Sequence, residues 1–393
     1  MAYTIFFIIV LIALMMDPMT LTRCLWDHSS VLEYIIGTFL LLYVASHNKR
    51  SSKSVKRIVY FTASILCIYS LSILLNGYID SDSFGVYIQD LFALLYLIVI
   101  IKAFETHNCI TFLNKWFKFV LTICVIVIVV SFIYNFVGLH AIFYRTKIMG
   151  YEVDEIPFVC LMHYVNNFGY VRPSWLFAEP SYLGFFLGLQ FLLFLQYVAQ
   201  NKRHKLLYIS LYLLALLATN AMTGYVCTAV SFIYYLLTRN LKIPKLALLL
   251  LVPLAISLYS AYDSKDIMED NDRIATSSLG TRQTRLIWGI SKVESMSSRE
   301  LLFGIGRNKI TKEAELGVSN VYLQFLIESG AIFLILVMVL FLLLLKKTSY
   351  EFFFTVLAFN ITEVALKPIT LLVMVIIFFY YSQPNTVIKT CRL

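Results

Sequence analysis

Two ionisable side chains stand before an apolar run in the segment RPSWLFAEPSYLGFF, residues 172–186. Arg172 opens the segment and Glu179 precedes Pro180, after which the chain stays apolar to Tyr197. Proline suits the first turn of a helix, so Pro180 marks a predicted helix N-terminus. That end attracts anions through its free N–H groups and partial positive charge, and Arg172 is near enough in sequence to cover it. The pair predicts a phosphate site, with Glu179 as a candidate proton acceptor or as the group that holds an arginine in place.

A second basic group lies in the stretch GTRQTRLIWGISKVESM. One set of its residues recurs at helical spacing and shares a face: Arg282, Arg285, Gly289 and Lys292. An adjacent face is apolar and carries Leu286, Ile290 and Val293. This pattern predicts an amphipathic helix lying along the membrane surface, with a basic face that receives a lipid-linked phosphate.

Arginine is the informative residue type at these positions. Its planar fork binds phosphate in a bidentate manner and keeps its charge when it is partly desolvated. Each charge-assisted hydrogen bond contributes roughly 1.5–3 kcal/mol. Three or four arginines could therefore stabilise a diphosphate leaving group without a metal. The simpler alternatives are an ion pair that caps a helix at Arg172 and Glu179, and contact with lipid headgroups at Arg282 and Arg285.

The elements that position these residues are predicted to be membrane-spanning helices. The chain is 60% hydrophobic and only 14% charged, against roughly 25% charged residues in soluble domains. Long uncharged runs recur along its length, which indicates an all-α polytopic membrane protein in a single transmembrane domain, 1–393. About twelve spans are expected, near 2–16, 31–46, 58–76, 86–101, 118–138, 181–200, 206–219, 222–238, 246–262, 319–345, 349–365 and 369–383.

The basic residues orient these spans. The net charge of +9 is compatible with a nucleic-acid partner, but lysine and arginine cluster in the short loops after even-numbered spans, for example at 49–57, 202–205 and 346–347. Such clusters mark the cytoplasmic side, so both termini are expected there. Two longer loops, 139–180 and 263–318, then face outward. Loops of this length are usually functional, so we expect the site to be built from these two.

The seven cysteines form no CxxC pair and no metal-ligand spacing. Cys67, Cys124 and Cys227 lie in apolar runs and are interpreted as small hydrophobic residues. Cys24 and Cys160 fall in predicted outer loops, so a disulfide between them is left open.

Several segments, taken in order, resemble the O-antigen polymerase and ligase family, that is, Wzy-type polymerases and their ligase relatives. They are RPSWLFAEPSYLGFFLG, ATNAMTGY, TRLIW, LLFGIGRN and SNVYLQFLIESGAIF. Fifteen residues separate Arg172 from Gly188, and Arg273 from Gly289, a spacing similar to one described for such polymerases.

This resemblance implies a C-type membrane glycosyltransferase architecture and a site at the outer, periplasmic face of the bacterial inner membrane. It implies transfer of a growing glycan from undecaprenyl diphosphate onto a new lipid-linked repeat unit, with inversion. It also implies that neither metal, nucleotide sugar nor other cofactor is needed. The implied partners are undecaprenyl-diphosphate-linked oligosaccharides, the bilayer and a Wzz-type regulator of chain length, with no nucleic acid.

The site residues expected on these grounds fall into two groups. Glu179, Arg172, Arg282 and Arg285 are the catalytic candidates. The candidates for substrate binding are Arg307, Asn320, Tyr322, Tyr182, Trp175, His163 and Arg273. Asn320 and Tyr322 have the alternative of capping and anchoring the span that follows them. Ligase relatives carry a histidine near the segment that reads GVSN here, at 317–320, so its absence favours polymerase over ligase.

Two rival functions stay open. A flippase or other transporter for the same lipid-linked glycan should have two similar halves and charges near the middle of the membrane. Neither feature is clear in the sequence. An O-antigen ligase would use the same chemistry on another acceptor.

Overall fold

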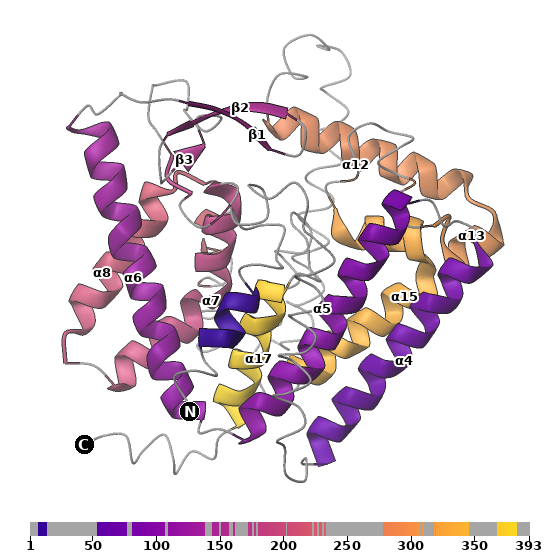
Figure 1. Ribbon diagram of the computed structural model, residues 1–393, viewed down its shortest axis with the longest axis horizontal. Coiled ribbons are helices and arrows are strands. Elements are labelled where there is room, and N and C mark those ends of the chain that lie inside the picture. The colour runs from indigo at the N-terminus through magenta and orange to yellow at the C-terminus, as the bar shows by residue number, and fades with distance from the viewer. Residues whose placement is uncertain are drawn as a thin grey trace, which may run out of the picture. The chain divides into compact units, whose positions relative to one another are not determined.

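The computed structural model describes a little over half of the chain, and every structural statement below concerns those residues. They are 7–13, 53–76, 81–106, 109–137, 144–148, 151–156, 160–161, 172–174, 177, 180–201, 203–221, 224–225, 228–229, 232, 278–306, 309, 318, 320–345 and 368–382. The elements with defined bounds (Figure 1) are α4 (Lys53–Leu75), α5 (Ser81–Thr106), α6 (Cys109–Asn135), β1 (Tyr144–Ile148), β2 (Tyr151–Ile156), β3 (Cys160–Leu161), α7 (Pro180–Asn201), α8 (Lys205–Ala218), α12 (Ser278–Ser295), α13 (Ser298–Phe303), α15 (Val321–Leu345) and α17 (Pro368–Ser382).

The helices lie where apolar runs predict spans. The elements α4, α5, α6, α7, α8, α15 and α17 coincide with the predicted spans 58–76, 86–101, 118–138, 181–200, 206–219, 319–345 and 369–383. The first predicted span is helical over 7–13, and the span 222–238 is described only in part. The predicted spans 31–46, 246–262 and 349–365 lie outside the described residues, so the total of about twelve stays a prediction.

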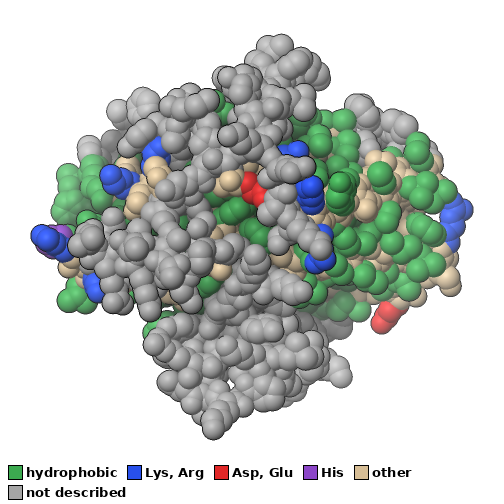
Figure 2. Space-filling model, turned by 90° about the horizontal axis from the view of Figure 1, so that it is seen from below, with side chains coloured by type: hydrophobic (Ala, Val, Ile, Leu, Met, Phe, Trp, Pro, Cys, Tyr) green, Lys and Arg blue, Asp and Glu red, His purple; other side chains and the backbone are tan. Residues whose placement is uncertain are grey.

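The chain is a membrane-embedded helical protein. Within the described ranges, four helical segments are long and apolar enough to cross a membrane: Lys56–Leu75, Thr111–Asn135, Pro180–Ala199 and Val321–Leu344. Large apolar side chains also stand on the outside, with Leu206 81% and Leu74 70% exposed. Figure 2 shows hydrophobic side chains over much of the described surface on the face that it draws. Such exposure is unfavourable in water and favourable in lipid.

The structure adds one feature that the all-α prediction lacks, a small antiparallel sheet in the order β1-β2-β3. It lies within the first long loop. The register places Arg145 opposite Asp154 and Lys147 opposite Glu152. This register defines a hairpin within the loop.

The chain divides into two compact units, each described by itself. The first comprises Met1–Ser52, Tyr96–Phe232 and Lys367–Leu393; the second comprises Lys53–Leu95 and Ile233–Leu366. In the first unit, α6, α7, α8 and α17 pack around aromatic side chains, with Phe117 stacked on Tyr197 at a centroid distance of 4.2 Å. A polar bond also crosses this core, because the indole N–H of Trp116 donates to Oε1 of Gln190 at 2.7 Å. In the second unit, α15 packs on α4 and α13.

Close packing in the first unit depends on two glycines. A Cβ on Gly224 would stand 2.8 Å from the Cα of Gly184 and 2.9 Å from its carbonyl oxygen. Both neighbours are backbone atoms of α7, so neither can rotate away. Small residues at such crossings let helices approach each other within a membrane.

Replacing Gly224 with alanine should therefore push the 221–225 segment away from α7. We expect a loss of about 1–3 kcal/mol of stability, the usual range for overpacking. Thermal unfolding of the detergent-solubilised chain, followed by size-exclusion chromatography, measures the loss. The control is Ala221→Gly, which removes a methyl group at the same crossing. An unfolding temperature for Gly224→Ala equal to that of the unmodified chain would contradict the close approach.

Candidate functional site

Arg172 lies at the end of the first unit where α7 begins and α8 ends. Its Nε–H donates to the carbonyl oxygen of Thr219 at 3.3 Å. Thr219 is the C-cap of α8, so the guanidinium sits where carbonyl groups accumulate partial negative charge. The sequence predicted that Arg172 would approach the N-terminus of α7. The bond to Thr219 ties Arg172 to the end of α8, and only three residues separate α7 from α8, which run antiparallel and bring these ends together. The approach of Arg172 to the N-terminus of α7 stays a prediction.

The N-terminus of α7 lies where Pro180 predicts it. The helix starts at Pro180, which is buried, and Tyr182 is half-buried in the first turn. Upstream, the amide of Phe177 donates to the carbonyl of Ser174, and the Phe177 ring packs on Phe186 at 5.1 Å. This turn fixes the approach of the chain to the helix. Glu179, Trp175 and His163 lie outside the described residues, so their roles stay predictions.

The predicted amphipathic helix is α12, and its residue pattern is confirmed. The apolar side packs on protein: Trp288 and Val293 contact a cluster of Ile305, Val318 and Ile327. Of the predicted apolar face, Val293 packs on this cluster beside α15, whereas Ile290 is 45% exposed. That α12 lies along the membrane surface stays a prediction.

Gly289 sets the distance between α12 and α15. A Cβ at this position would meet Cδ2 of Leu323 at 2.5 Å and Cγ1 of Val318 at 3.2 Å. Only glycine lets α12 lie this close to the N-terminal end of α15. The spacing that placed Gly289 on the basic face therefore also fixes where the neighbouring arginines lie.

Among the catalytic candidates in the second unit, Arg285 is the residue whose side chain the structure describes. The residue is half-buried, its Nε is buried, and that atom has no hydrogen-bond partner among the described residues. A buried N–H without an acceptor is costly, so the group that accepts this bond is expected outside the described residues. Arg282 lies one turn earlier on α12, and its side chain is not among those that the structure describes.

A helix break lies beside α12 and was not predicted. Gly330 interrupts α15 with φ 84° and ψ 169°. The break is sealed by the loop after α13: the amide of Ile305 donates to the carbonyl of Ile327 at 2.8 Å, and Gly306 donates to Glu328 at 3.1 Å. Backbone groups freed within an apolar helix need such partners. The glycines in the stretches FGIG and ESG were the sequence signal from which this break could have been predicted.

The loop that seals the break is itself held by α4 and α13. Phe303 accepts hydrogen bonds through its carbonyl from the hydroxyl of Ser72 and the amide of Asn76. Ser297 and Glu300 form a capping box at the start of α13. The bond from the Ser297 backbone N–H holds the pKa of the Glu300 carboxyl below its usual range. These contacts fix the loop directly before Arg307, which lies outside the described residues, as does Arg273.

Asn320 caps α15. Its Oδ1 accepts the Leu323 amide at 3.0 Å, as expected of an N-cap asparagine. Tyr322, in the first turn, is half-buried. The capping alternative for Asn320 is therefore confirmed, while binding of substrate by Asn320 or Tyr322 stays a prediction.

Two buried carboxyl groups within the helices were missed by sequence reasoning. Asp90 is 7% exposed and accepts the hydroxyl of Tyr69 at 2.6 Å. Glu328 is 1% exposed, precedes the break in α15, and accepts the side-chain amide of Gln324 at 3.3 Å. Acidic side chains inside membrane helices are rare and usually functional. Each is the single acidic residue of its predicted span, and this isolated position was the sequence signal from which a buried carboxyl group could have been predicted.

The predicted arginine cluster divides between the two units. Arg172 belongs to the first unit, whereas Arg282 and Arg285 belong to the second. A common pocket for all three therefore stays a prediction.

Comparison with known proteins does not assign the chain to a family, so a functional assignment has to rest on its residues. No protein-family model matches the chain, and no curated protein matches it significantly.

Proposed function

We propose that the chain is an O-antigen polymerase, an inverting glycosyltransferase with about twelve spans and C-type architecture. It transfers a growing glycan from undecaprenyl diphosphate onto the non-reducing end of a new lipid-linked repeat unit. The site faces the periplasm from the bacterial inner membrane, with both termini in the cytoplasm. A regulator of chain length is the proposed protein partner.

The proposal rests on one observation, the buried Nε atom of Arg285. An amphipathic helix at the end of a membrane-spanning helix holds a half-buried guanidinium whose Nε has no acceptor among the described residues. Such a group suits a phosphate oxygen of a lipid carrier, since arginine binds phosphate in a bidentate manner. As the diphosphate leaves, negative charge builds up on it, so Arg282 and Arg285 would favour the transition state over the bound substrate.

A second candidate function is supported by the buried acids. Asp90 and Glu328 are ionisable groups within membrane helices, and α15 is discontinuous beside Glu328. Transporters use broken helices and intramembrane carboxyl groups of this kind. A flippase for the lipid-linked glycan is therefore the alternative.

One reconstitution separates the candidates. The purified chain is placed in vesicles with lipid-linked repeat units, and the products are resolved on a gel. A ladder of lengthening glycans is the expected result. Unchanged units that cross the vesicle wall would identify a flippase and overturn the polymerase. Transfer to added lipid A core, without a ladder, would identify a ligase.

A further inference from the structure

The short helix α13 is bonded at both of its ends to one end of the span that α4 forms. The guanidinium of Arg299 donates to the carbonyl oxygen of Leu75 at 3.0 Å, and Leu75 is the last residue of that span. The carbonyl of Phe303, at the other end of α13, accepts the hydroxyl of Ser72. Figure 1 shows α13 beside this end of α4. Because a span ends where the hydrocarbon layer ends, α13 lies at the edge of that layer.

The span that α15 forms places the same region within the membrane. Gly330 lies roughly 14 Å beyond the start of this span at Val321, at a rise of 1.5 Å per residue. A Cβ on Gly330 would collide with the carbonyl oxygen of Leu302, so the backbone of α13 crosses α15 at this depth. Irregular backbone at membrane depth is tolerated where it is buried in protein. The loop 304–306 meets this condition, since it is buried and donates backbone hydrogen bonds to α15.

The outward side of α13 is apolar. Leu301 and Leu302 are 38% and 47% exposed. They continue the exposed apolar surface at the end of α4, where Leu71, Leu74 and Leu75 also face outward. Because α4 stands in lipid and α13 is bonded to its end, the same lipid reaches both sets of leucines.

We propose that α13 and the loop 304–306 form a re-entrant segment, which dips into the leaflet at the C-terminal end of α4 and contacts phospholipid through Leu301 and Leu302. Arg299 is exposed and marks the level of the phosphates, where basic side chains at the ends of spans come to lie. Only residues 296–297 separate α12 from α13, so this contact also fixes the depth of the adjoining end of α12. The inference goes beyond the proposed function, because it requires neither glycan nor catalysis.

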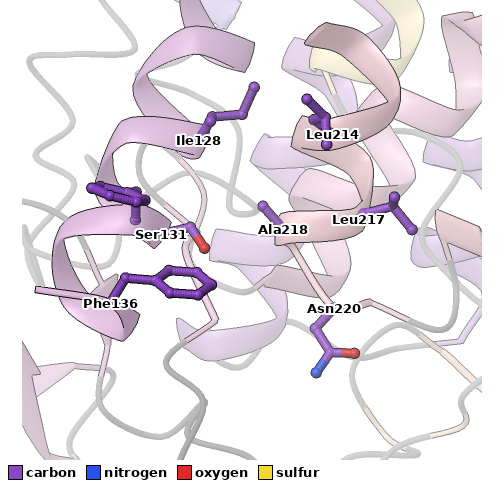
Figure 3. A pocket seen from close by; sticks show the side chains of 8 residues that line it. Ile128, Ser131, Phe136, Leu214, Leu217, Ala218 and Asn220 are labelled. Carbon is purple, nitrogen blue, oxygen red and sulfur yellow. The ribbon is translucent and has the colours of Figure 1, made fainter. Parts of the chain in front are cut away.

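The test uses the full chain in nanodiscs of brominated phosphatidylcholine, with a fluorescent amino acid in place of Leu302. Bromine near the headgroup end of the acyl chains should quench this probe about twofold more than bromine near the methyl end, as expected at an interface. The same probe at Cys67, an exposed position in the middle of α4, should show the opposite order. Leu214, on the wall of the open groove between α6 and α8 (Figure 3), is the positive control in the first unit. A probe at Leu302 that bromine does not quench, or quenches most from the methyl end, would overturn the proposal.

A photoreactive amino acid in place of Leu302 identifies what covers this side of α13 in native membranes. Phospholipid adducts, detected by mass spectrometry, are the expected result. An adduct with a second copy of the chain or with another protein would overturn the proposal, since the leucines would then form a protein interface.

A charged variant tests whether the leucines set the depth of α13. Leu301→Asp brings a carboxylate to the edge of the hydrocarbon layer, where a charge is costly. It should lower the quenching at position 302 by headgroup-end bromine about twofold, whereas Ser291→Asp, on the exposed side of α12, should not. Unchanged quenching in Leu301→Asp would count against the proposal, and the unmodified leucine face decides the lipid contact even where this variant does not fold. A chain that passes this test but makes no glycan would overturn the polymerase and leave the inference standing.

Discussion

Replacing Arg285 with lysine should lower the rate of glycan polymerisation about tenfold to hundredfold, at saturating lipid-linked substrate. Lysine keeps the charge but loses the planar fork, so bidentate contact with phosphate is lost. A lost charge-assisted hydrogen bond of roughly 1.5–3 kcal/mol corresponds to this range of rates. The loss should fall on turnover more than on substrate affinity, because the leaving group gains charge only as the bond breaks. Initial rates from the gel ladder, over a range of substrate concentrations, measure both.

The matched control is Arg203→Lys. Arg203 is exposed between α7 and α8, in a loop predicted to be cytoplasmic. The same chemical change there should leave the rate within about twofold, since exposed surface substitutions have small effects. Near-normal polymerisation by Arg285→Lys would remove Arg285 from the site.

Replacing Gly330 with alanine should destabilise the second unit by about 3 kcal/mol or more. Two penalties add at this position. The backbone has φ 84° and ψ 169°, a conformation that L side chains rarely adopt. A Cβ would also stand 2.2 Å from the carbonyl oxygen of Leu302. Thermal unfolding of the detergent-solubilised chain, with folded yield as a second readout, measures the loss.

Gly306→Ala is the control that separates these penalties. Gly306 has φ 110°, but a Cβ there would approach its nearest neighbour, Cβ of Asn76, only to 3.8 Å. This variant should suffer the conformational penalty alone, about 1–3 kcal/mol. Gly304 resembles Gly330, because its Cβ would meet the carbonyl of Glu328 at 2.3 Å. Equal losses at all three glycines would show that the crossing at the break is looser than described.

The break also links stability to the proposed site. The part of α15 before Gly330 carries Leu323, against which Gly289 of α12 packs. Arg285 lies one turn from Gly289 on the same helix. A shift of the crossing at Gly330 would therefore move the guanidinium, so Gly330→Ala should reduce polymerisation even in the fraction that folds.

Much of the helical architecture could be predicted because its cause is local. The apolar runs that form α6 and α15 must satisfy their backbone groups within lipid, and a helix does this from within its own sequence. Pro180 predicted the start of α7 because a proline at the first turn loses no hydrogen bond. The spacing of Arg282, Arg285 and Gly289 predicted a shared face of α12 because the period of a helix is fixed.

The features that could not be predicted from the sequence depend on contacts between residues far apart in the chain. Gly330 lies in a strongly apolar run, and only the loop at 304–306 explains why the helix breaks there. The hairpin of β1 and β2 depends on pairing across the loop. The bond of Arg172 to Thr219 joins residues that are 47 positions apart in the chain.

The sequence by itself therefore determined that the chain spans a membrane, where most described helices run, and which residue types could bind phosphate. The tertiary structure alone decided which carbonyl receives Arg172, where α15 is interrupted, and that the apolar side of α12 packs on protein. The physical reason is the range of the interactions. Hydrophobic burial and helix geometry act within a segment, whereas hydrogen bonds and close packing between segments exist only once the chain has folded.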